Sequence, residues 1–139
     1  MKTIIAGSRT ITDYDILRKV LKECPWEITE IVSGTARGVD ILGERYAEDH
    51  GIPLKRFPAD WNNLAQPGAK VKLDSRTPRQ YNSNAGHFRN EQMAQYAEAC
   101  VLIWDGKSTG TLSMWRLAQR YGLKILVVNT LTCEKSFTL

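Results

Sequence analysis

Cysteine, histidine and long apolar runs are all scarce in this chain of 139 residues. The three cysteines, Cys24, Cys100 and Cys133, are widely spaced and form no Cys-x-x-Cys pair, so neither a disulfide framework nor a structural zinc site is indicated. We expect all three to be small buried residues. The two histidines, His50 and His87, show no metal-binding or catalytic-triad spacing. We therefore expect no metal and no other cofactor.

The longest apolar stretches, such as Val101–Trp104 and Ile125–Val128, are far shorter than the ~20 residues that span a membrane. The N-terminus also lacks the apolar region of a signal peptide. We therefore predict a cytoplasmic protein without a membrane partner. The composition, with 42% hydrophobic and 24% charged residues, is typical of one globular domain and argues against disorder.

Positive charge is concentrated in one part of the chain. The net charge of the whole sequence is +4. Seven basic residues and two acidic ones fall between Lys55 and Asn90, which gives this segment a net charge of +5 and the rest −1. Such a distribution favours a local anionic partner, with a solvated basic loop as the alternative.

Hydrophobic periodicity predicts strands that alternate with helices of ten to fifteen residues. Short apolar runs indicate five strands, over 3–6, 29–32, 54–57, 101–104 and 125–128. Helical spacing falls between them, ending at Pro25, Gly51, Ala97 and Gly122. This alternation predicts an α/β fold: a single Rossmann-like, doubly wound parallel sheet with helices on both faces.

The periodicity also sets the expected domain organisation. Residues 1–130 form one domain, and residues 131–139 are expected to be a tail. Within the domain, residues 58–83 lack periodicity and contain three of the five prolines, which predicts a long basic loop.

Three turns rich in small residues follow predicted strands. With the common strand order 3-2-1-4-5 these turns are neighbours, and ligands of such sheets bind beyond the carboxyl ends of the strands. Glycine lets backbone approach a ligand, and helix N-termini attract anions. We therefore predict an anion site. Its candidate residues are Gly7, Ser8 and Arg9, then Ser33, Gly34, Thr35, Arg37 and Gly38, and finally Asp105, Gly106, Ser108, Gly110 and Thr111.

A further set of candidates lies on the helices beside these turns. Arg89 can hold a phosphate with two nitrogens, and Asn90 follows it. Glu91 is a candidate base or ribose ligand, with ordinary capping of a helix N-terminus as the alternative. Asp40 is expected to support the Gly34 turn, with ribose contact as the alternative.

Neither of two familiar phosphate-binding motifs is complete. The turn after the first strand lacks the G-x-G-x-x-G spacing of a dinucleotide site. The run Gly106-Lys107-Ser108 resembles the end of a P-loop, but Val101 occupies the position of its required first glycine.

Four motifs in this order, GSR at 7–9, SGTARGVD at 33–40, AGHFRN at 85–90 and WDGKSTGT at 104–111, resemble the YspA/YpsA-like branch of the SLOG superfamily. That superfamily includes cytokinin-activating phosphoribohydrolases and DNA-processing protein A of bacteria, and similar members occur in phages. The resemblance implies a Rossmann-like fold, a nucleotide-derived ligand bound at the strand ends and a homodimer.

One residue departs from the phosphoribohydrolase motif PGGxGTxxE. Met114 occupies the position of the glutamate that helps to cleave the N-glycosidic bond, whereas Gly110 and Thr111 retain the phosphate-binding part. Arg89 stands where the hydrolases keep a catalytic arginine. The resemblance therefore implies ligand binding and leaves hydrolysis in doubt.

Three functions follow from these observations. The first is a nucleotide-binding protein that recognises a phosphorylated ribonucleotide derivative, for sensing or sequestration. The second is a nucleoside 5′-monophosphate N-glycosidase that uses Arg89 with Glu91, or with Asp105 in reserve. The third is single-stranded nucleic-acid binding by the basic loop, with Trp61 and Tyr81 for stacking. The basic residues for this third function are Lys70, Lys72, Arg76 and Arg79.

Overall fold

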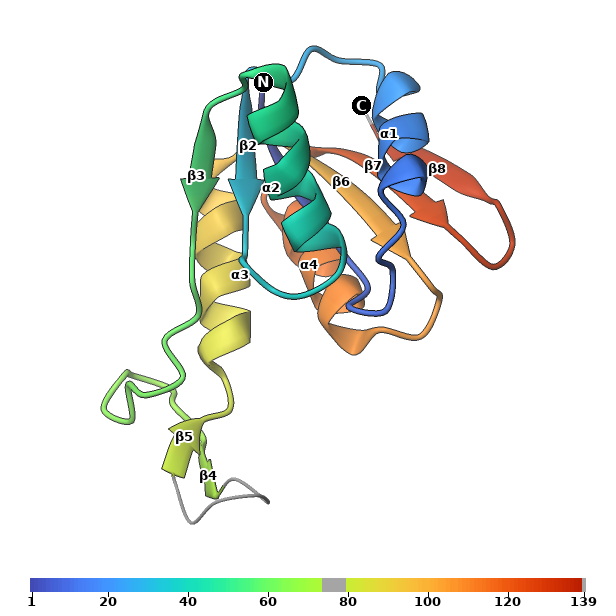
Figure 1. The fold of residues 1–139 in the computed structure, drawn as a ribbon. Helices are drawn as coiled ribbons and strands as arrows, with labels where there is room; N and C mark the ends of the chain where they lie inside the picture. Colours follow the sequence, from blue (N-terminus) through green and yellow to red (C-terminus); the bar gives the residue numbers. More distant parts are fainter. Residues whose placement is uncertain (74–79, 139) are drawn as a thin grey trace.

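The computed structural model describes residues 1–73 and 80–138 (Figure 1). Arg76 and Arg79 of the basic loop lie outside the described residues. The helices are α1 (Tyr14–Lys22), α2 (Val39–His50), α3 (Ala85–Tyr96) and α4 (Thr109–Arg120). The strands are β1 (Lys2–Gly7), β2 (Glu30–Ser33), β3 (Leu54–Arg56), β4 (Val71–Leu73), β5 (Gln80–Asn82), β6 (Ala99–Trp104), β7 (Lys124–Asn129) and β8 (Lys135–Thr138).

The main sheet has the order β3-β2-β1-β6-β7-β8. Its first five strands are parallel to their neighbours, and β8 pairs antiparallel with β7. The five parallel strands follow the predicted order 3-2-1-4-5. The α/β, Rossmann-like fold that the sequence predicts is therefore confirmed.

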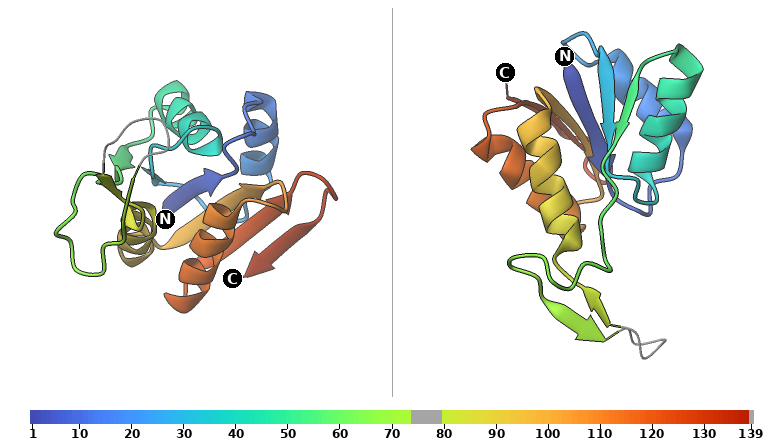
Figure 2. Two further views of the ribbon diagram at one scale, coloured as in Figure 1. Left: turned by 90° about the horizontal axis from the view of Figure 1, so that it is seen from below. Right: turned by 90° about the vertical axis from the view of Figure 1, so that its left-hand side faces the viewer.

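Helices cover both faces of this sheet, as the right-hand view of Figure 2 shows. The two faces are separate cores because successive residues of a strand point to opposite sides. Ile4 of β1 packs in one core with Met93 of α3 and Leu117 of α4. The next residue, Ile5, packs in the other core with Leu17 of α1. The paired helices therefore fix where each strand ends, and with it the edge that carries the predicted turns.

The C-terminal residues differ from the expected tail. Lys135–Thr138 forms the edge strand β8, which hydrogen-bonds along β7 and extends the sheet beyond its parallel part. All four residues of β8 are exposed, so their sequence carries no alternation that would predict a strand. Backbone pairing with the otherwise open edge of β7 accounts for the strand instead.

The cysteines are less uniformly buried than the sequence suggests. Cys100 is buried in β6, Cys24 is half-buried and Cys133 is exposed in the turn before β8. The expectation of three buried cysteines is therefore wrong for Cys133.

We call residues 58–83 the arm; its described part, residues 58–73 and 80–83, projects from the sheet beyond the carboxyl ends of the strands (Figure 1). The sequence predicts an irregular loop here, but the arm contains the antiparallel pair β4–β5. These strands have three residues each, and β4 is wholly exposed, so no burial pattern marks them in the sequence. Among the described residues, no helix has the length and apolar character needed to cross a membrane.

Candidate functional site

A small cavity of about 60 Å³ lies where the carboxyl ends of β1, β2 and β6 meet the N-termini of α3 and α4. Four segments of the chain line it. The lining residues are Ala6, Gly7 and Arg9 from the end of β1, Ala36 and Asp40 from the β2–α2 region, Arg89 and Asn90 from α3, and Ser108, Gly110, Thr111 and Met114 from α4 and its cap. The cavity therefore lies at the edge of the sheet where the sequence predicts a ligand.

The first turn of α4 presents backbone N–H groups to this cavity. Ser108 caps the helix, and its Oγ accepts the Thr111 N–H at 3.3 Å. Asp105 orders the preceding turn by accepting the N–H groups of Lys107 at 2.8 Å and Ser108 at 2.9 Å. These two hydrogen bonds lower the pKa of Asp105. Asp105 thus shapes the turn, and the helix dipole makes the cavity favourable for an anion.

Arg89 brings a buried positive charge to the cavity. Its side chain is on a residue only 8% exposed, and Nη1 donates to the carbonyl oxygen of Gly34. Nε donates to Asn90 Oδ1 at 2.9 Å. Within the described part of the chain, Nη2 donates no hydrogen bond. The fixed guanidinium therefore keeps one nitrogen for a ligand.

Arg9 adds a second positive charge to the cavity lining. It is exposed in the turn after β1, in contrast to the buried Arg89. Burial lowers the pKa of Arg89, Asp40 opposes this effect, and the positive charge of Arg9 adds to it. An arginine nevertheless stays protonated in proteins. The positive charges of Arg9 and Arg89 repel each other, so an anion bound in the cavity would stabilise both.

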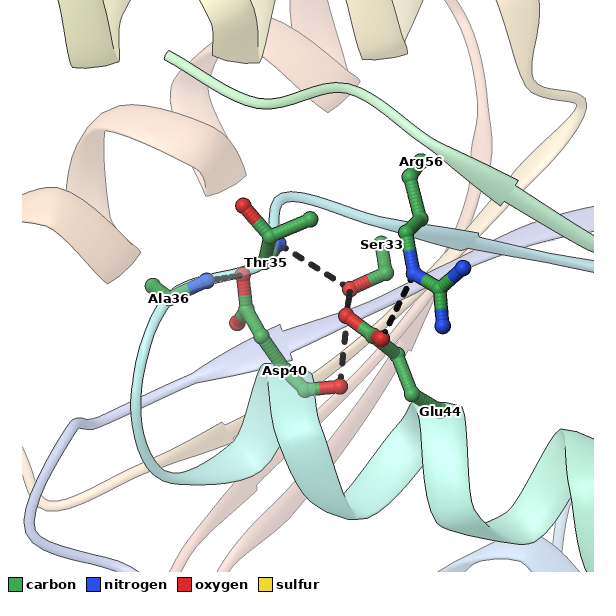
Figure 3. Close-up of polar contacts among 6 residues, drawn as sticks. All are labelled: Ser33, Thr35, Ala36, Asp40, Glu44 and Arg56. Atoms are coloured by element: carbon green, nitrogen blue, oxygen red, sulfur yellow. Dashed lines mark hydrogen bonds and ion pairs between the residues drawn. The ribbon is translucent and has the colours of Figure 1, made fainter.

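Asp40 is the buried carboxyl group of the cavity, at 4% exposure. Burial raises its pKa to about 6, while Arg89 acts in the opposite direction. Its Oδ2 accepts the Ala36 N–H at 3.3 Å, as Figure 3 shows. Asp40 therefore supports the β2–α2 turn, as expected, and also faces the ligand cavity.

A polar cluster behind Asp40 holds the same turn (Figure 3). Ser33 Oγ donates to Glu44 at 2.8 Å and accepts the N–H of Thr35 at 3.1 Å. Arg56 on β3 pairs with the other oxygen of Glu44 at 2.8 Å. Thr35 has a φ of 62°, a region that disfavours side chains with a β-carbon. The cluster therefore holds in place a turn that backbone preference alone would not select.

Gly34 is required where this turn meets Arg89. A β-carbon on Gly34 would lie 2.8 Å from Arg89 Nη1 and 2.8 Å from Asp40 Oδ2. Both neighbours are buried and hydrogen-bonded, so neither has room to move away. The absence of a side chain at Gly34 therefore leaves room for Arg89 and Asp40 to pack against the turn.

Eight of the residues predicted from sequence line the cavity: Gly7, Arg9, Asp40, Arg89, Asn90, Ser108, Gly110 and Thr111. Others support the turns without lining it: Ser8, Ser33, Gly34, Thr35, Gly38, Asp105 and Gly106. Arg37 is exposed outside the lining set. Ala6 and Ala36 also line the cavity, but the sequence does not predict them as site residues. Their methyl side chains have no polar group that would mark a site, and their small size leaves room for the cavity.

Glu91, the candidate catalytic carboxylate, is directed elsewhere. It is not among the cavity residues, and its Oε1 accepts a hydrogen bond from the hydroxyl of Tyr121 at 2.8 Å. Tyr121 caps the C-terminus of α4, at the far end of that helix from the cavity. Met114, by contrast, is 1% exposed and lines the cavity. The position of the hydrolase glutamate therefore faces the cavity with an apolar side chain.

A larger surface groove of about 520 Å³ lies over α1 and α2, away from the cavity residues. Its polar groups pair with one another. Tyr14 donates to Asp49 at 2.8 Å, and Arg45 lies 3.7 Å from the same carboxylate. The described residues also contain no group of three or more His, Cys, Asp or Glu side chains placed to hold a metal ion.

Three comparisons relate the chain to known proteins. Residues 1–63 match the family described as "YspA, cpYpsA-related SLOG family". The Gene 61 protein of Mycobacterium phage D29 is 27% identical over 135 residues, which cover 90% of this chain and 94% of that protein. The X-ray structure of DNA processing protein A (DprA) from Streptococcus pneumoniae has a TM-score of 0.66 at 19% identity.

The DprA likeness covers 91% of this chain and 50% of the DprA chain, so our chain spans half of that structure. At this identity the likeness concerns the fold. The family match and the phage relative, however, rest on sequence, and the family match includes the turns after β1 and β2. The resemblance drawn from the motifs is thus confirmed for the N-terminal part of the chain: residues 1–63, which include the motifs at 7–9 and 33–40, match the YspA, cpYpsA-related SLOG family.

Proposed function

We propose that this protein binds a phosphorylated ribonucleotide derivative, as a sensor or a store of that ligand, with the phosphate in the cavity. The observation that carries the proposal is the meeting of Arg9, Arg89 and the first turn of α4 at one cavity. The SLOG relation supports a nucleotide-related ligand.

The chemistry of the three groups is complementary to a phosphate. The guanidinium Nη2 of Arg89 and the side chain of Arg9 supply charge-assisted donors. The N–H groups near Gly110 and Thr111 supply neutral donors aligned with the helix dipole. A single phosphate accepts hydrogen bonds from both sets at once.

Calorimetry on the whole chain tests the proposal directly. The ligands are AMP, GMP, CMP, UMP, ribose 5-phosphate and inorganic phosphate, with adenosine as the uncharged control. We expect the phosphorylated compounds to bind and adenosine to bind far more weakly. Equal binding of adenosine and AMP would remove the phosphate from the proposed site.

Replacing Gly110 with alanine separates ligand binding from folding. A β-carbon at Gly110 meets no protein atom within 4 Å, so Gly110→Ala is expected to preserve or raise stability, by about 0.5–1 kcal/mol. The methyl group would occupy the cavity side of the first turn and weaken phosphate binding by about 1 kcal/mol, the value of one hydrogen bond. Urea unfolding and calorimetry measure the two effects.

The matched control for this variant is Thr109→Ala, one residue earlier on the same turn. Thr109 is exposed and does not line the cavity, so its removal should leave affinity unchanged. Equal losses in the two variants would mean that Gly110 does not face the phosphate.

One observation favours a second candidate, the N-glycosidase. Asp40 is a carboxyl group in the cavity beside Arg89, and its pKa of about 6 lies near the range useful for acid–base catalysis. Hydrolysis needs a carboxylate beside the ribose, and Met114 cannot supply one. Asp40 is instead held by the backbone of its own turn.

We accordingly expect no free base to be released from the common nucleoside monophosphates, and none after Met114→Glu alone. Chromatography of overnight incubations measures the release. Free base formed by the native protein, and lost in Asp40→Asn, would show that Asp40 supplies the missing carboxylate and that the protein is an enzyme.

A further inference from the structure

The arm is joined to the start of α3 through one buried residue, Asn82. Its side chain is fully buried, and Oδ1 accepts the N–H groups of Lys70 at 3.3 Å and Asn84 at 3.0 Å. Its Nδ2 donates to Gln66 at 3.0 Å, and its backbone N–H donates to the carbonyl of Trp61 at 2.6 Å. One backbone hydrogen bond therefore ties Trp61 to the segment that leads into α3.

This position brings the indole of Trp61 next to the buried arginine of the cavity. A β-carbon on Gly86 would lie 3.3 Å from Trp61 Cη2 and 3.7 Å from Arg89 Nη2. The indole and the nitrogen left for a ligand thus lie within 4 Å of a single point. Gly86 has no side chain to separate them.

The indole is also accessible. Trp61 is 39% exposed, whereas Asn82, which donates a hydrogen bond to its carbonyl, is buried. A partly exposed aromatic ring on an ordered segment is suited to stacking on a planar ligand, because little conformational freedom is lost on binding.

The size of the cavity shows why such a surface is needed. At about 60 Å³ it is far smaller than the roughly 300–1,000 Å³ of pockets that enclose whole ligands. It can hold the phosphate of a nucleotide but not the base. The remainder of the ligand must lie outside the cavity, over the surface next to Arg89.

We propose that Trp61 is the base-stacking residue of this site, which makes the ligand a compound with an aromatic base attached to its phosphate-bearing part. The inference rests on the proposed function, because it takes the phosphate at Arg89 as its starting point. It adds a specificity-determining residue from the arm, a part of the chain outside the cavity lining.

The test compares a nucleotide with the same molecule lacking its base. The tightest-binding of AMP, GMP, CMP and UMP is titrated by calorimetry beside ribose 5-phosphate. In the native chain the nucleotide should bind more tightly. Trp61→Leu should weaken the nucleotide by about 5- to 100-fold, the range for one stacked base, and leave ribose 5-phosphate unchanged. Trp61→Phe keeps a ring and should retain most of the affinity.

Leu64→Ala is the matched control, since Leu64 is another exposed apolar residue of the arm, at 37% exposure. It should bind both ligands like the native chain. Indole fluorescence gives an independent readout: the nucleotide should quench the native chain more strongly than Trp61→Phe, which retains Trp26, Trp104 and Trp115.

The outcomes separate the two proposals. If neither ligand binds the native chain, the proposed function fails. If both bind equally well, and Trp61→Leu changes neither, the phosphate site stands and the stacking role of Trp61 is wrong. A third outcome concerns the source of the base. An oligonucleotide could bind more tightly than the mononucleotide, with an affinity that falls steeply as the salt concentration rises. This result would contradict the proposal of a mononucleotide ligand and indicate that nucleic acid binds along the arm.

Discussion

Alanine in place of Arg89 is expected to weaken binding of a nucleoside 5′-monophosphate by about 1.5–3 kcal/mol, the range for hydrogen bonds to charged groups. The same variant should also lower the free energy of unfolding, because Arg89 donates to the Gly34 carbonyl and opposes the negative charge of Asp40. Removing it leaves a buried carboxyl group without its cation. Calorimetry measures the affinity, and urea unfolding measures the stability.

Variants of two other arginines separate the loss of affinity from the loss of stability. Arg9 is exposed and lines the cavity, so Arg9→Ala should lose a similar part of the affinity with little change in stability. Arg37 is exposed on the neighbouring turn but does not line the cavity, so Arg37→Ala should change neither quantity. If Arg37→Ala weakened binding as much as Arg9→Ala, the anion would lie outside the cavity, over the surface of the turns.

The stability of the native chain relative to Asp40→Asn is expected to fall as the pH rises from about 4 to above 6. Burial raises the pKa of Asp40 from 3.8 to about 6, so the folded chain holds a proton that the unfolded chain has released. A group of this kind stabilises the fold fully below its unfolded pKa and loses that contribution as the pH rises through its folded pKa. The two values differ by an amount equivalent to about 3 kcal/mol, which sets the upper limit of the change.

Asparagine cannot ionise, but it can still accept the Ala36 N–H, so it isolates the titration of this one group. The charged groups that act on Asp40, Arg89 and Glu44, are present in both proteins. Urea unfolding at intervals across this pH range gives the difference between the two free energies. Parallel curves for the two proteins would show that Asp40 has an ordinary pKa.

The sequence predicts the fold well because both faces of the sheet are covered by amphipathic helices. The central parallel strands then appear as short apolar runs, as Val101–Trp104 does in β6. Three strands escape prediction: β4 and β8 are exposed along their whole length, and β5 has only three residues, of which one is buried. These strands form through backbone hydrogen bonds, which produce no hydrophobic pattern in the sequence.

In the site, too, local sequence patterns predict the turns, whereas contacts between residues distant in the sequence are not predicted. The turns after β1, β2 and β6 are recognisable because glycine and hydroxyl residues follow an apolar run at each strand end. The role of Glu91 is not recognisable in this way, since residues two apart on a helix point in different directions. Arg89 faces the cavity, and Glu91 faces Tyr121. The proximity of Trp61 to Arg89 depends on Asn82, and it cannot be read from a separation of 28 residues along the chain.

The arm and the main sheet have no strand in common, because β4 and β5 pair only with each other. Neither hydrophobic core contains a residue from the described part of the arm. Under the two proposals above, base preference and phosphate binding are therefore encoded in separate stretches of sequence. Exchanging the arm between related proteins, with Asn82 and the start of α3 retained, would give the same phosphate site a different choice of ligand without repacking the domain.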